Sequence, residues 1–184
     1  MRSAMMRCVM LVALGMVPAC GDSSPRAEGG AGDSAANVLA SVGIGSVLPD
    51  YRATTLTGDA VRLGGAGGPL TLVNVWATWC TSCKEEMQDL AAIHRDYATR
   101  GLRVVAVSVD AGSEALVRRF VQREALRFPV VHDQAGLMQR QYHIVGVPTS
   151  YLIGADGRVL WQQVGGIHGN LPAVRVEVER AMRR

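Results

Sequence analysis

Two cysteines separated by two residues are the part of this sequence best suited to carry chemistry. Cys80 and Cys83 enclose the dipeptide Thr81–Ser82 and directly follow Trp79. At the start of a helix, two thiols at this spacing can close a small disulfide, and the unpaired N–H groups there favour the thiolate of the first. We therefore predict that Cys80 is the nucleophile of a thiol–disulfide exchange and that Cys83, one turn further along, is the resolving thiol.

The N-terminal residues have the layout of an export signal. Residues 1–7 carry two arginines and no acid, residues 8–17 are apolar apart from one glycine, and Ala19 precedes Cys20. An apolar stretch of this length is too short to span a bilayer. The segment resembles the lipobox of bacterial lipoproteins, so we predict a signal peptide over residues 1–19 and lipid attachment at Cys20. The alternative is an ordinary signal peptide in which this cysteine has no role.

The other cysteines support a redox role for the central pair. Cys8 leaves with the predicted leader and Cys20 is taken up by the lipid, so only Cys80 and Cys83 remain in the mature domain. No cysteine is left for a structural disulfide. In a small exported protein, a single close pair is better explained by redox or metal chemistry than by stabilisation of the fold.

Length and composition indicate one globular domain and a short extension. The chain has 184 residues, of which 48% are hydrophobic and 19% charged, with a formal net charge of +3. Without the leader, 17 basic side chains stand against 16 acidic ones, which gives no basic surface for nucleic acid. Residues 20–37, rich in Gly, Ser, Ala and Asp, predict a flexible tether, and residues 38–184 a single domain, which we expect to be a monomer.

Apolar, β-branched runs alternate with amphipathic stretches along the domain, which predicts an α/β fold. A strand followed by a helix and another strand implies parallel pairing with right-handed crossovers. The turn at Asp156–Gly157 between two apolar runs predicts a hairpin near the C-terminus. A short hairpin over residues 53–63 comes first. Expected strands cover residues 70–76, 102–109, 150–153 and 158–164, and residues 128–132 form a short strand or an extended link. Expected helices run from near Cys80 to Gly101 and over residues 113–124, 134–142 and 172–184.

Three motifs together resemble the thioredoxin superfamily. They are the run from Val73 to Cys83, the segment from Gly146 to Thr149, and the Asp156–Gly157 turn. The chain resembles more narrowly the TlpA/ResA-like branch of the AhpC/TSA and redoxin group, over residues 47–184. This resemblance implies a thioredoxin-like fold: a central mixed β-sheet flanked by helices, with an N-terminal β-hairpin and an additional helix and strand over residues 113–132.

The same resemblance implies site residues and partners. Pro148 corresponds to a cis-proline that faces the cysteines, and the backbone beside Val147 pairs with an extended substrate. The surroundings of the pair then include Asn74, Trp79, Thr81 and Ser82. Members of this branch are tethered outside the cytoplasm and reduce disulfides of exported proteins, often in cytochrome c maturation, after reduction by a membrane thiol-disulfide donor. We expect no cofactor.

Two residues depart from the pattern of relatives. Many relatives have proline where this chain has Ser82, and thioredoxin has a buried aspartate at the position of Asn74. An amide cannot relay a proton, so water or another carboxylate must assist deprotonation of Cys83. Glu85 and Glu86 are candidates only by proximity, and we interpret them instead as acids of the first helical turn that complement the positive end of the helix dipole.

Two alternative functions use the same cysteines. A copper or zinc carrier needs a histidine near the pair, but no histidine lies at ligand spacing from it, and we expect no metal site; the four are His94, His132, His143 and His168. A peroxiredoxin-type peroxidase has a threonine three residues before its attacking cysteine, where this chain has Ala77. Disulfide reduction is the function that the residues favour.

Overall fold

The structure is a computed structural model that describes residues 42–184. The predicted signal peptide, Cys20 and the tether to residue 37 lie outside the described residues and stay predictions. None of the helices in the described range combines the length and the apolar composition that a bilayer crossing requires.

Five strands form a mixed sheet in the order β5-β4-β3-β6-β7. Strands β3, β4 and β5 are parallel, whereas β6 pairs antiparallel with β3 and β7. The predicted mixed sheet and the C-terminal hairpin are therefore confirmed. The strands are β3 (Thr71–Trp76), β4 (Arg103–Ser108), β5 (Val130–His132), β6 (Thr149–Ile153) and β7 (Val159–Val164).

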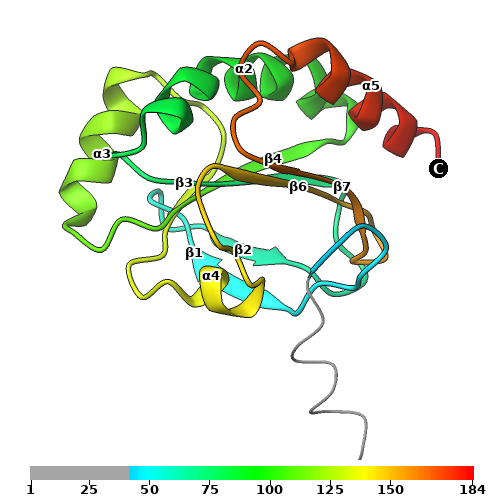
Figure 1. The fold of residues 1–184 in the computed structure, drawn as a ribbon, viewed down its shortest axis with the longest axis horizontal. Coiled ribbons are helices and arrows are strands. Elements are labelled where there is room, and N and C mark those ends of the chain that lie inside the picture. Colours follow the sequence, from blue (N-terminus) through cyan, green and yellow to red (C-terminus); the bar gives the residue numbers. More distant parts are fainter. Residues whose placement is uncertain (1–41) are drawn as a thin grey trace, which may run out of the picture. The chain divides into compact units, whose positions relative to one another are not determined.

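Helices cover one face of the sheet, and the N-terminal hairpin with a short helix covers the other (Figure 1). Helices α2, α3 and α5 lie on the first face. The hairpin of β1 and β2 forms its own antiparallel sheet and lies with α4 on the second face. The bounds are β1 (Tyr51–Thr54), β2 (Ala60–Leu63), α2 (Thr81–Tyr97), the 3-10 turn η1 (Ala98–Arg100), α3 (Glu114–Arg123), α4 (Leu137–Gln141) and α5 (Leu171–Met182).

Strand β3 lies at the centre of the sheet and is buried on both faces. Because side chains alternate along a strand, Leu72 and Trp76 point into the core beneath the helices, and Val73 and Val75 point into the core beneath the hairpin. Asn74 therefore shares the face of Leu72 and Trp76. This register places a polar amide under helix α2, which begins at the cysteine pair.

Candidate active site

Cys80 is the N-cap residue of helix α2. Its backbone is extended, with φ −87° and ψ 115°, and its Sγ accepts a hydrogen bond of 3.2 Å from the backbone N–H of Cys83. A sulfur in this position lies against the unpaired N–H groups of the first helical turn, which stabilise negative charge. The two cysteines form a disulfide, with their Cα atoms 5.3 Å apart. The arrangement can store and release two electrons.

The two thiols differ in their access to solvent. Cys80 is 7% exposed, whereas Cys83 is completely buried on the inner face of the helix. The intervening Thr81 and Ser82 are both exposed, and Ser82 Oγ lies 3.5 Å from Cys80 Sγ. Trp79, the residue before the pair, is 68% exposed. A polypeptide that approaches the pair therefore meets Cys80 first.

The loop before β6 brings a cis peptide bond to the cysteines. The Val147–Pro148 bond is cis, and the carbonyl oxygen of Val147 lies 3.7 Å from Cys80 Sγ. Thr149 supports this loop by donating a 2.8 Å hydrogen bond from its hydroxyl to the carbonyl of Gly146. Pro148 is buried, whereas Val145 at the rim is 94% exposed. The structure thus brings the predicted residues Cys80, Val147 and Pro148 together.

Glu86 lies inside the protein beyond the first turn of helix α2, so the interpretation of it as a first-turn acid is wrong. Its side chain is completely buried, whereas the neighbouring Glu85 is exposed. The Glu86 carboxylate accepts hydrogen bonds of 2.7 Å from the side-chain amide of Asn74 and from the backbone N–H of Ile167. These two donors replace the water that a buried carboxylate loses. The burial of Glu86 follows from its helical phase, since it shares one face with Cys83, Met87, Leu90 and Ile93.

Burial raises the pKa of Glu86 above its ordinary value. Loss of hydration is the largest cause, and the hydrogen bonds from Ile167 and Asn74 lower the pKa in part. A carboxyl group with a raised pKa can exchange a proton closer to neutral pH than an exposed glutamate can. Cys83 and Glu86 lie one turn apart on the same helix face, where side chains three residues apart are neighbours.

Asn74 can serve both protonation states of Glu86. Its Nδ2 donates to Glu86 and, at 3.0 Å, to Ser150 Oγ, while its Oδ1 is buried and has no hydrogen-bond partner within the described part of the chain. A half-turn of the amide brings Oδ1 to the place of Nδ2, where it accepts a hydrogen bond from protonated Glu86. Asparagine at this position does not itself titrate, so Glu86 is the carboxyl group of this hydrogen-bonded pair.

A second buried carboxylate, which the sequence analysis missed, fixes the segment before the cysteines. Asp110 is 4% exposed and accepts hydrogen bonds from the backbone N–H of Thr78 at 3.0 Å, from the Thr78 hydroxyl at 2.6 Å and from the Ser108 hydroxyl at 2.7 Å. Asp110 lies two residues beyond the end of strand β4, and Thr78 lies two residues beyond the end of the parallel neighbour β3. A polar residue at the carboxyl end of a buried parallel strand is the signal that could have identified it.

The histidines have separate environments. His132 Nε2 lies 2.8 Å from the carbonyl oxygen of Asp110, and His168 Nδ1 lies 2.9 Å from a carboxylate oxygen of Asp89. Burial lowers the pKa of His94. Among residues 42–184, no three His, Cys, Asp or Glu side chains gather closely enough to hold a metal ion.

Comparisons with known proteins agree with this geometry. Residues 44–162 match the model of the AhpC/TSA family. The thiol-disulfide oxidoreductase ResA of Bacillus thuringiensis subsp. konkukian is 32% identical over 123 residues, which cover 67% of this chain and 70% of that protein. The thioredoxin-like protein YneN of Bacillus subtilis is 36% identical over 123 residues, covering 66% and 71%.

A solved structure gives the same result. A protein from Chlorobium tepidum assigned as the thiol:disulfide interchange protein DsbE superposes with a TM-score of 0.71 at 30% identity, covering 77% of this chain and 99% of that one. The relatives and the described cysteine pair point to the same reaction, the reduction of protein disulfides by thiol–disulfide exchange.

Proposed function

Because the chain belongs to the AhpC/TSA family and is a thiol-disulfide oxidoreductase, we propose that Cys80 is its nucleophile and Cys83 its resolving thiol. The observation that carries this proposal is the inequality of the two sulfurs. Cys80 caps the helix and is the more exposed, whereas Cys83 is enclosed by the core. A thiolate at a helix N-terminus is stabilised, so the accessible sulfur is also the more reactive one.

The reaction begins from the reduced pair. The Cys80 thiolate attacks one sulfur of a substrate disulfide, the substrate S–S bond breaks, and the second substrate sulfur leaves as a thiolate that takes up a proton. Cys83 then loses its proton and attacks Cys80 Sγ in the mixed disulfide. The first substrate sulfur leaves as the second thiol, and the two electrons now missing from the pair are those gained by the substrate.

Glu86 accepts the proton of Cys83 in the second step. Cys83 is completely buried, so its thiolate cannot be formed by direct transfer to bulk water. Glu86 lies one turn further along the same face, and Asn74 and Ile167 hold its carboxylate. Its raised pKa makes it a better base near neutral pH than an ordinary glutamate.

The substrate chain binds in extended form beside the cis-proline loop. The carbonyl of Val147 lies next to Cys80 Sγ, where it can accept a backbone hydrogen bond from a strand-like polypeptide. Trp79 and Val145 are the exposed apolar side chains closest in sequence to Cys80 and to this loop. Both can pack against residues that flank the target cysteine.

We further propose that the enzyme works outside the cytoplasm on a lipid anchor at Cys20. The support is the composition of residues 1–20, a basic start, an apolar run and a small residue before the cysteine. The substrates are then disulfides of exported proteins, including apocytochromes c, and a membrane thiol-disulfide donor restores the reduced pair. Retention of the protein in the membrane fraction, and its release on substitution of Cys20 by serine, tests the anchor.

Trapping of mixed disulfides tests the roles of the two cysteines. In a Cys83→Ala variant the resolving thiol is missing, so substrate proteins remain linked to Cys80 and appear as reducible adducts. The matched Cys80→Ala variant keeps only the buried thiol and should capture none. Equal trapping by both variants, or trapping by the Cys80→Ala variant alone, contradicts the assignment.

A further inference from the structure

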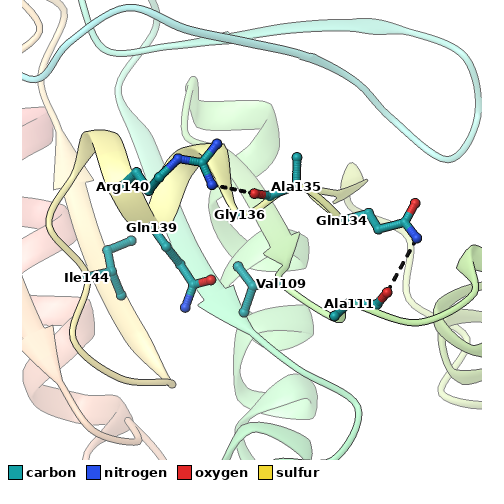
Figure 2. Close-up of a pocket in the computed structure, with 8 residues that line it drawn as sticks. All are labelled: Val109, Ala111, Gln134, Ala135, Gly136, Gln139, Arg140 and Ile144. Carbon is teal, nitrogen blue, oxygen red and sulfur yellow. Dashed lines mark hydrogen bonds between the residues drawn. The ribbon is translucent and has the colours of Figure 1, made fainter.

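An open cavity of about 390 Å³ lies between helix α4 and the connection from β4 to α3 (Figure 2). Val109 and Ala111 form one wall, and Ala135, Gln139, Arg140 and Ile144 form the other. Gln134 holds the walls together by donating a 3.3 Å hydrogen bond to the carbonyl of Ala111. The mechanism derived above makes no use of this cavity.

Hydrogen bonds or short chain segments link both walls of the cavity to residues that lie beside the disulfide. Val109 donates its N–H to the carbonyl of Trp76 at 2.9 Å, and Asp110, between Val109 and Ala111, holds Thr78 two residues before Cys80. On the other wall, Ile144 precedes Val147 by three residues, at most about 11 Å of chain. Since the Val147 carbonyl lies 3.7 Å from Cys80 Sγ, the cavity is within reach of a substrate bound there.

The lining combines apolar surface with one positive charge. Val109 and Ile144 supply aliphatic surface, and Arg140 is the only ionisable residue among those that line the cavity within the described range. Two buried acids are sequence neighbours of the lining residues, but their carboxylates are occupied by other groups. Asp110 accepts hydrogen bonds from Thr78 and Ser108. Asp133 accepts hydrogen bonds from the backbone N–H groups of Leu137 and Met138. Within residues 42–184 the Arg140 guanidinium donates a hydrogen bond to the carbonyl of Ala135 and forms no salt bridge, so its charge at the rim has no acidic partner there.

We propose that this cavity is a specificity subsite, which binds an acidic side chain of the substrate polypeptide about three or four residues from its target cysteine. The spacing follows from the rise of about 3.3 Å per residue of an extended chain. The proposal rests on the proposed function, because the substrate must be a polypeptide bound in extended form beside Cys80. The aliphatic wall contacts the stem of the side chain, and Arg140 binds its carboxylate.

Peptides with a thiopyridyl disulfide on their single cysteine test the subsite. Reduced enzyme releases thiopyridine when Cys80 attacks, and the rate constant is compared for peptides with Glu, Gln or Lys at the third or fourth residue on either side. We expect the Glu peptide to react about 1.5- to fivefold faster than the Lys peptide, the range for exposed charge pairs. An Arg140→Glu substitution should reverse this order.

Arg119→Glu is the matched control, since Arg119 is an exposed arginine on α3 and changes the net charge equally. It should leave the Glu to Lys ratio near the wild-type value. An equal change in both variants assigns the preference to long-range charge and overturns the subsite.

Ala135→Trp is a second variant, which fills the cavity from an exposed turn. It should slow all three peptides while leaving the reduction of the small neutral 2-hydroxyethyl disulfide unchanged. If wild-type enzyme reduces 2-hydroxyethyl disulfide but reacts with the Glu, Gln and Lys peptides at the same rate, the subsite proposal is wrong and the redox function stands. If it reduces no disulfide at all, the proposed function itself fails.

Discussion

The carboxylate of Glu86 accepts a 2.7 Å hydrogen bond from the side-chain amide of Asn74, within the core beneath helix α2. In thioredoxin the residue corresponding to Asn74 is the buried acid itself. Here the strand supplies an amide and the helix supplies the acid, one turn beyond Cys83. The carboxyl group is supplied by helix α2 and not by strand β3, and in the proposed mechanism Glu86 is therefore the residue that takes the proton of the resolving thiol.

Replacement of Glu86 by glutamine should slow the resolving step. Glutamine keeps the size of the side chain but cannot accept the Cys83 proton, and general base catalysis contributes about 10²-fold or more to a rate. Rapid-quench experiments should therefore show the mixed disulfide accumulating, while its formation at Cys80 keeps the wild-type rate. Glu85→Gln, at the exposed neighbour, serves as the control, and an equal effect of the two substitutions argues against the role of Glu86.

The same substitution should change how stability depends on pH. Burial raises the Glu86 pKa above its ordinary value of 4.5, so the folded protein retains a proton that the unfolded chain has released. The corresponding stabilisation is complete below about pH 4.5 and is lost as the pH rises through the raised pKa. Between about pH 4.5 and 8, the oxidised Glu86→Gln variant should therefore gain stability relative to oxidised wild type. Urea unfolding at several pH values measures this, and parallel curves for the two proteins would falsify the assignment.

Asp110→Asn should affect both stability and the reactivity of Cys80. Asparagine offers one neutral acceptor where the carboxylate serves Thr78 and Ser108, so we expect a loss of about 1–3 kcal/mol in the free energy of unfolding. The loosened segment should also slow the attack of Cys80 on 2-hydroxyethyl disulfide. Asp133→Asn is the control, because this buried acid caps helix α4 and should lower stability alone. Wild-type reactivity in the Asp110→Asn variant would show that Asp110 acts only on the fold.

The two tryptophans of the motif should respond oppositely to truncation. Trp76 is completely buried, and its ring centroid lies 4.8 Å from that of Phe120. The Trp76→Ala substitution should therefore lower the free energy of unfolding by about 3–5 kcal/mol. Trp79 is largely exposed, and Trp79→Ala should change the free energy of unfolding by no more than about 0.5 kcal/mol. The Trp79 variant should instead lose activity towards protein disulfides and keep it towards small ones. A large loss of stability at Trp79 would mean that this ring packs on the domain and is not available to substrates.

Much of the fold could be predicted because its signals are local. The apolar run of β3, the helical phase of α2 and the Asp156–Gly157 turn each depend on neighbours a few residues away, and all three elements are present as expected. The ends of elements were less accurate. Residues 128–132, expected as a short strand or an extended link, form a strand only from Val130, because the preceding Pro129 has no N–H group to donate to the sheet.

The sequence by itself determined the chemistry of this protein, since two thiols at one helical turn and a helix N-terminus beside them depend on covalent spacing alone. Only the tertiary structure decided which acids serve those thiols. Glu86 is joined to Ile167, and Asp110 to Thr78, by contacts between segments 81 and 32 residues apart. Burial sets the pKa of a carboxyl group, and burial is a property of elements that meet in space. For that reason two adjacent glutamates, which the sequence analysis interpreted alike, became one exposed and one buried carboxyl group.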